Sequence, residues 1–138
     1  MRRAELLNLE LGDLRDNGIY IVSRVGRRTK SGKWRLIPYT NGARKAIKVL
    51  AEETKGEYLI PQKHKDSLSR AFKVCAERAG LPGSLHCLRH TYASHLVMAG
   101  VPLRAIQQVM GHSTITVTEK YAHLDPDYLD SRIGELVI

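Results

Sequence analysis

The stretch that decides the fold is LHCLRHTY at residues 85–92, followed by the Gly-His step at residues 111–112 and by Tyr121. Side chains three and four positions apart share one face of a helix, so the two histidines and the arginine of the first segment are predicted to project from one edge. An apolar stripe on another face is predicted to bury the helix. It contains Leu85, Leu88, Tyr92, Leu96 and Ala99. Imidazoles, a guanidinium and a phenol together suit a phosphate anion, because arginine can fork onto two oxygens and a phenol can attack phosphorus.

The charge of the chain favours a polyanionic partner. Lys and Arg number 22 against 14 Asp and Glu, a net charge of +8, and a basic balance of this size is typical of proteins that bind nucleic acid. At 138 residues we expect one domain with one core. No apolar run approaches the roughly 18 residues of a membrane span, so we expect no membrane partner. Cys75 and Cys87 lack CxxC spacing and are predicted to be reduced and structural.

Apolar spacing and turn residues predict a mainly helical chain with a few short strands. Helices are expected at residues 2–9, 41–53, 67–79, 85–99, 102–110 and 126–138. Strands are expected at residues 19–24, 34–39 and 58–60. The segment 114–118, TITVT, alternates and is β-branched, which favours a strand.

Basic side chains gather between the first two predicted strands. Arg27, Arg28, Lys30 and Lys33 lie on a glycine-bearing hairpin tip, and four cations so close together favour a phosphate contact over a merely solvated loop. A second basic cluster precedes the helix at 67–79 and contains Lys63 and Lys65. We expect all of these except Lys30 to contact DNA backbone.

Several segments, in this order, resemble the tyrosine recombinases, also called phage-type integrases. Residues 86–91 read HCLRHT, residues 110–112 read MGH and residues 121–124 read YAHL. Upstream, RRAEL at residues 2–6 resembles the first arginine box of that family, and TKSGK at residues 29–33 resembles its lysine-bearing turn. The resemblance covers nearly the whole chain.

The resemblance implies an α+β fold, a mainly helical catalytic domain with a small three-stranded antiparallel sheet on one edge. Residues 1–138 would form that domain, N-terminally truncated and without the family's N-terminal DNA-binding domain. Residues 126–138 would either pack over their own domain or be exchanged with a neighbouring protomer. The resemblance also implies that residues 114–118 belong to a helix that carries Tyr121. Double-stranded DNA is the implied partner, with self-association into a dimer or a tetramer on it. The implied location is the cytoplasm, at the nucleoid, of a bacterium that encodes the protein itself or carries it on a phage or other mobile element.

The implied reaction cleaves and rejoins DNA strands through a 3′-phosphotyrosine intermediate, with no metal, cofactor or ATP. Tyr121 would be the nucleophile and His86 its proton acceptor. Arg2 and Arg89 would clamp the non-bridging oxygens of the phosphate. The remaining roles would fall to His112 as a donor to the phosphate, Lys30 as the general acid, Glu5 as the residue that orients Arg2, and His90 as a supporting residue.

Other interpretations of the same residues remain open. His86 and His90 have the spacing of a zinc pair, although no acidic residue lies between them and no third ligand is obvious nearby. A non-catalytic, helix-turn-helix-like DNA-binding module, or an inactivated recombinase fragment, would explain the charge but not the ordered presence of Lys30, His112 and Tyr121. Tyr128 is a rival nucleophile, and Tyr92 is expected in the core. The sequence does not specify the DNA target, or whether integration, excision or chromosome-dimer resolution results.

Overall fold

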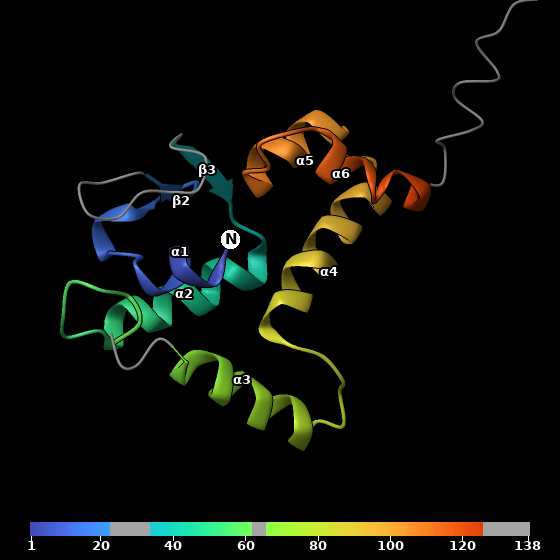
Figure 1. The fold of residues 1–138 in the computed structure, drawn as a ribbon. Helices are drawn as coiled ribbons and strands as arrows, with labels where there is room; N and C mark the ends of the chain where they lie inside the picture. The colour runs from blue at the N-terminus through green and yellow to red at the C-terminus, as the bar shows by residue number, and fades with distance from the viewer. Residues whose placement is uncertain (23–33, 62–65, 126–138) are drawn as a thin grey trace, which may run out of the picture. The chain divides into compact units, whose positions relative to one another are not determined.

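The computed structural model describes residues 1–22, 34–61 and 66–125 and contains two compact units, Met1–Cys87 and Leu88–Ile138 (Figure 1). The chain is mainly helical with one small three-stranded antiparallel sheet, which confirms the predicted α+β class. None of the helices in these ranges has the length and apolar character needed to cross a membrane. Several predicted features lie outside the described residues, namely Arg27, Arg28, Lys30, Lys33, Lys63, Lys65, Tyr128 and the helix at 126–138.

Within its described residues, the first unit combines the sheet with helices and a short 3-10 helix. Its elements are α1 (Arg3–Leu7), η1 (Leu11–Asp13), β1 (Leu14–Arg15), β2 (Gly18–Ile21), β3 (Arg35–Pro38), α2 (Asn41–Glu53) and α3 (Ser67–Arg78). The strand order is β1-β2-β3, and both pairings are antiparallel (Figure 1).

The third strand of the sheet is β1, so the predicted strand at residues 58–60 is wrong. Tyr58 makes only an isolated bridge to Glu10. Asp16 and Asn17 join β1 to β2, with Arg15 paired to Gly18. A two-residue strand carries no alternating apolar pattern, so periodicity could not reveal it.

Close packing at Gly18 fixes the register of β2 against β3. Gly18 is buried and pairs with Pro38. A Cβ atom built at this position would lie 2.4 Å from the carbonyl oxygen of Ile37, so only glycine fits. The register places Arg35 and Ile37, two residues apart on β3, among the buried residues of the unit.

The helices of the first unit begin and end at expected residues but bury less than expected. Thr40 caps α2, its hydroxyl accepting a hydrogen bond from the Ala43 amide at 3.2 Å. In α3 only Ala76 is buried, whereas Phe72, one turn before it, and Leu68, two turns before it, are half-buried. Three further small side chains, Ala71 and Cys75 on this helix and Ala79 just after it, are exposed. The apolar residues of α3 lie on two neighbouring faces of the helix, and the face that contains Ala76 is the buried one.

In residues 88–125, the described part of the second unit, the helical segments pack around a small core. They are α4 (Leu85–Met98), whose first turn belongs to the first unit, α5 (Leu103–Met110), α6 (Thr116–Glu119) and the 3-10 helix η2 (Ala122–Leu124). The core contains Ala93, Val97, Ile106 and Met110, and each is at most 1% exposed. Figure 1 shows α5 and α6 side by side. Tyr92 and Tyr121 pack against this core from the rim.

The buried face of α4 differs from the predicted stripe. It consists of Arg89, Ala93 and Val97, at successive four-residue intervals, whereas Leu88 is 53% exposed. Leu85, Tyr92 and Leu96 are half-buried, and Ala99 is exposed. Apolar residues occupy much of the circumference of α4, so spacing alone did not identify the core face. Small Ala93, fully buried, lies there together with the arginine.

Residues 114–118 do not form the strand that their alternation favours. Thr116 begins α6, so the helix implied by the family resemblance is correct for residues 116–118, whereas residues 114 and 115 precede it. Tyr121 does not lie on that helix, however. It comes after Lys120, the residue that ends α6, and immediately before η2. Tertiary packing overrides the β propensity here, because Thr118 is fully buried within the second unit.

Candidate active site

The first group of candidate residues is a charged cluster in the first unit, Arg2, Glu5 and Arg35. Arg2 immediately precedes α1, and its backbone amide donates to Glu5 Oε2 at 2.7 Å. The Arg2 guanidinium lies 3.3 Å from Glu5 Oε1, and the Arg35 guanidinium donates to Glu5 Oε2 at 2.7 Å. The contact expected between Glu5 and Arg2 is therefore present, with Arg35 as a second partner of the same carboxylate.

Arg35 is a residue that the sequence reasoning missed. Its side chain is 7% exposed, as is that of Glu5, whereas that of Arg2 is 27% exposed. Burial by itself raises the pKa of Glu5, but the bond from Arg35 and the contacts with Arg2 outweigh it, and the pKa is lowered. The position of Arg35 in the strand could have indicated its role. Arg35 lies two residues before Ile37 and therefore on the same face of β3, and a charge at a buried strand position needs a partner.

Replacing Glu5 with Gln should destabilise the protein by about 3 kcal/mol at pH 7, because the buried Arg35 loses its counter-charge. The lowered pKa means that ionised Glu5 stabilises the fold above the ordinary value of 4.5, and that this contribution is lost as the pH falls further. The stabilities of the parent and of Glu5→Gln in urea unfolding should therefore differ most at neutral pH, and the difference should shrink as the pH falls below 4.5. The exposed Glu52→Gln should change stability by less than about 0.5 kcal/mol. A pH-independent difference between Glu5→Gln and the parent would contradict the ion-pair origin.

The second group lies in the second unit and starts with Arg89. This arginine is 8% exposed, and its Nη2 donates to the backbone carbonyl of Met110 at 2.5 Å. Met110 is the last residue of α5, so the bond ties the guanidinium to the end of that helix. A buried arginine fixed by a carbonyl holds its remaining N–H groups in a defined direction, which is what the recognition of an oxyanion needs.

His112 is positioned by the turn that follows α5. Gly111 has a φ of +65°, a left-handed conformation that favours glycine, and it ends the helix. The His112 amide then donates to the Gln107 carbonyl at 3.1 Å. The imidazole is fixed through Nδ1, which lies 2.8 Å from the hydroxyl of Thr118. Thr118, fully buried on α6, is a second residue that the sequence reasoning missed. Its β-branching was attributed to a strand.

Tyr121 is held next to His90. Its backbone amide donates to the Thr118 carbonyl at 3.0 Å, and its half-buried ring packs against the core of the unit. The phenolic oxygen forms a hydrogen bond with His90 Nδ1, and the two ring centroids are 6.0 Å apart. His90 was expected only to support the site. The structure instead places it in direct contact with the candidate nucleophile.

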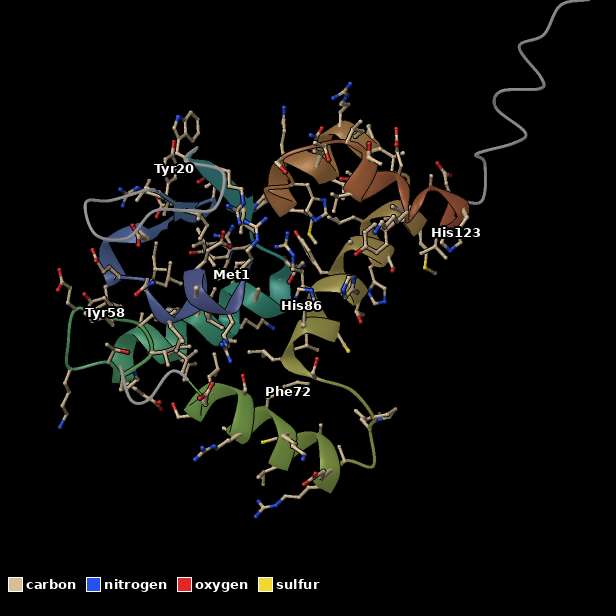
Figure 2. All side chains as sticks on the ribbon, in the orientation of Figure 1. Met1, Tyr20, Tyr58, Phe72, His86 and His123 are labelled. Carbon is tan, nitrogen blue, oxygen red and sulfur yellow. The ribbon has the colours of Figure 1, made fainter. Side chains whose placement is uncertain are left out.

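The remaining candidates are placed as follows. His86 lies in the first turn of α4, where it is exposed (Figure 2). Tyr92 packs against the core as expected, and burial raises the pKa of its phenol. Cys75 and Cys87 are both reduced, as predicted, but they are exposed rather than structural. Within residues 1–22, 34–61 and 66–125, no three His, Cys, Asp or Glu side chains are placed to hold a metal ion.

Comparison with known proteins identifies the family. The model of the phage integrase family matches residues 1–127. This chain belongs to the phage integrase family. It is 34% identical to the tyrosine recombinase XerD of Rhizobium meliloti (strain 1021), an alignment that covers 99% of the chain and 46% of the relative. The chain thus spans about half the length of the curated relatives it matches.

Solved structures agree with this membership. The catalytic domain of bacteriophage HP1 integrase matches the chain with a TM-score of 0.73 at 26% identity, over 99% of this chain and 74% of that one. The Tn1549 transposon integrase, solved in complex with circular intermediate DNA, matches with a TM-score of 0.77 at 24% identity. That alignment covers 99% of the chain and 56% of the integrase. The fold of the chain is therefore that of integrase catalytic domains.

Proposed function

We propose that this phage integrase family member cleaves and rejoins DNA strands through a covalent 3′-phosphotyrosine intermediate formed by Tyr121. The observation that carries the proposal is the arrangement of the second unit. A phenol is held against an imidazole, and an arginine and a second histidine are each fixed by a buried partner. These side chains are what phosphoryl transfer to a tyrosine requires. The non-catalytic DNA-binding module would leave the contact between His90 and Tyr121 without a use.

In the proposed reaction Tyr121 attacks phosphorus and the 5′ oxygen leaves. Arg89 clamps the non-bridging oxygens of the phosphate, where negative charge builds up in the transition state. One such preorganised donor is worth on the order of 10²–10³ in rate. His112 donates to the same phosphate, and its contact with Thr118 through Nδ1 directs Nε2 away from α6. Positive side chains stabilise the phosphate, so the scheme needs no metal. The phosphotyrosine ester conserves the energy of the broken phosphodiester bond, so rejoining needs no ATP.

The family resemblance assigns Arg2 as the second clamp in this proposal. Glu5 and Arg35 keep its guanidinium in place, because the carboxylate that contacts Arg2 is itself fixed by a buried arginine. Lys30 as general acid and His86 as proton acceptor are assigned by the family resemblance. The same holds for the DNA contacts of Arg27, Arg28, Lys33, Lys63 and Lys65.

Double-stranded DNA is the proposed partner, and the net charge of +8 supports it. The Tn1549 integrase in complex with DNA supports it too. Residues 1–138 would act as the catalytic domain, in the cytoplasm of a bacterial host. Self-association into a dimer or a tetramer on DNA, with exchange of residues 126–138, belongs to the same proposal and can be followed by sedimentation with and without that segment.

The proposal is tested by trapping the intermediate. We expect the chain to form an adduct that survives a denaturing gel when it is incubated with duplexes that carry a single nick within randomised sequence. The short strand beside the nick diffuses away after cleavage, so the covalent complex accumulates. Sequencing the trapped strands would identify the preferred duplex. The yield should be unchanged in excess EDTA, because no metal takes part.

Two results would contradict the proposal in different ways. No adduct from the parent chain, together with salt-sensitive DNA binding, would favour the non-catalytic module. An adduct whose formation requires added zinc or magnesium would contradict the assignment of the charge-stabilising role to arginine and histidine.

A further inference from the structure

We propose that His90 is a catalytic residue that accepts the phenolic proton of Tyr121 during strand cleavage, the role that the family resemblance gives to His86. This inference rests on the proposed function and specifies where the proton of the nucleophile goes. It comes from one direct contact, the hydrogen bond between His90 Nδ1 and the Tyr121 hydroxyl.

The contact joins two well-fixed groups. His90 lies one residue after Arg89, whose buried guanidinium ties α4 to the end of α5. Two backbone hydrogen bonds of 3.0 Å hold Tyr121. Its amide donates to the Thr118 carbonyl, and its carbonyl accepts from the Leu124 amide. Its ring packs on the core of the second unit. Because both backbones are fixed, the phenolic oxygen meets the imidazole without any rearrangement of the free protein.

The two tautomers of His90 differ in what this contact can do. With the ring proton on Nδ1, the imidazole donates to the phenolic oxygen and cannot take a proton there. With the ring proton on Nε2, the phenol donates to Nδ1, which can then accept its proton. The proposal assigns the second tautomer to the reactive state.

The proposed step balances. A bond forms between the Tyr121 oxygen and phosphorus as the phenolic proton moves to His90 Nδ1, which produces an imidazolium. The bond between phosphorus and the 5′ oxygen breaks, its electron pair stays on that oxygen, and the oxygen takes a proton from the general acid, proposed to be Lys30. Rejoining reverses each transfer. General base help of this kind is typically worth about 10²–10⁴ in rate.

Other titratable groups lie close along the two segments that meet at this contact, so the pH dependence has to be assigned by substitution. Those within about one turn of His90 or Tyr121 are His86, Cys87, Arg89, Tyr92, Glu119, Lys120, His123 and Asp125. Among them His86 is the direct competitor for the role, since it lies on the same helix as His90, four residues earlier.

The experiment compares three Asn substitutions, at His90, His86 and His95, on the preferred nicked duplex selected by the parent. Asn carries its amide near the position of Nδ1, so it can keep the hydrogen bond to Tyr121 but cannot take up the proton. We expect His90→Asn to slow adduct formation about 10²–10⁴-fold and to abolish the fall in rate toward low pH that protonation of a base causes. His86→Asn should keep that fall. The exposed His95→Asn should resemble the parent.

A second measurement tests the contact without any reaction. In ¹⁵N spectra of the free chain, the Nδ1 signal of His90, assigned by its loss in His90→Asn, should shift in Tyr121→Phe. An unshifted signal would overturn the inference. So would a His90→Asn rate close to that of His95→Asn, or a fall at low pH that disappears in His86→Asn but remains in His90→Asn. Absence of adduct from the parent would overturn the proposed function instead, and this inference with it.

Discussion

Replacing Tyr121 with Phe should abolish the covalent protein–DNA adduct completely while leaving DNA affinity within about twofold of the parent. The substitution removes one oxygen, the atom that would bond to phosphorus, and no other side chain can supply the same bond from the same place. Affinity should persist because it depends on cationic contacts with phosphates. The ring itself should keep its place against the core of the second unit. Adduct is measured on a denaturing gel and affinity by filter binding.

Two other tyrosines serve as controls for this result. Tyr92→Phe should form adduct at the parental rate, because Tyr92 packs against the core and burial raises the pKa of its phenol, so it is a poor nucleophile. Tyr128→Phe tests whether Tyr128, the other candidate nucleophile, forms the adduct. An adduct that survives Tyr121→Phe and disappears with Tyr128→Phe would show that the nucleophile had been assigned to the wrong tyrosine.

The parts of the fold that the sequence predicts well are those marked by strong local signals. Thr40 begins α2 as expected, and Gly111 ends α5 in the left-handed conformation typical of a helix end. The order of short motifs, from Arg2 to Tyr121, was sufficient to indicate the family, because no single motif had to carry the assignment. The family resemblance also corrected the strand that β propensity favours around Thr116.

The parts that the sequence could not reveal depend on contacts between distant residues. Arg35 reaches Glu5 across 30 positions of the chain, and Arg89 reaches Met110 across 21. Neither arginine differs in type from the many exposed cations of this basic chain. Only a structure shows which charges are buried and what they touch. The contact between His90 and Tyr121 spans 31 positions and was missed for the same reason.

Arg89→Ala should slow adduct formation by at least 10²–10³-fold, the loss expected for one preorganised donor to the charge of the transition state. Arg89→Lys should be nearly as slow, because an ammonium lacks the planar fork that grips two oxygens. Either change also removes the donor to the Met110 carbonyl, so urea unfolding should show a loss of stability of about 1–3 kcal/mol. Arg104→Ala, at an exposed arginine on α5, should behave like the parent. The rate is measured with saturating protein, so that weakened binding does not contribute.

A substrate with sulfur in place of the bridging 5′ oxygen separates the clamp from general acid help. An alkoxide leaves poorly, since its parent acid is nearly as weak as water, with a pKa of about 15.7. A thiol has a pKa near 8.5 and leaves as thiolate without receiving a proton. Lys30→Ala, slow on normal DNA, should therefore recover on the sulfur substrate. Arg89→Ala should stay slow on both, because charge accumulates on the non-bridging oxygens whichever atom leaves. Recovery of Arg89→Ala on sulfur would instead place its guanidinium at the leaving oxygen, and the clamp would then have to be assigned to other donors.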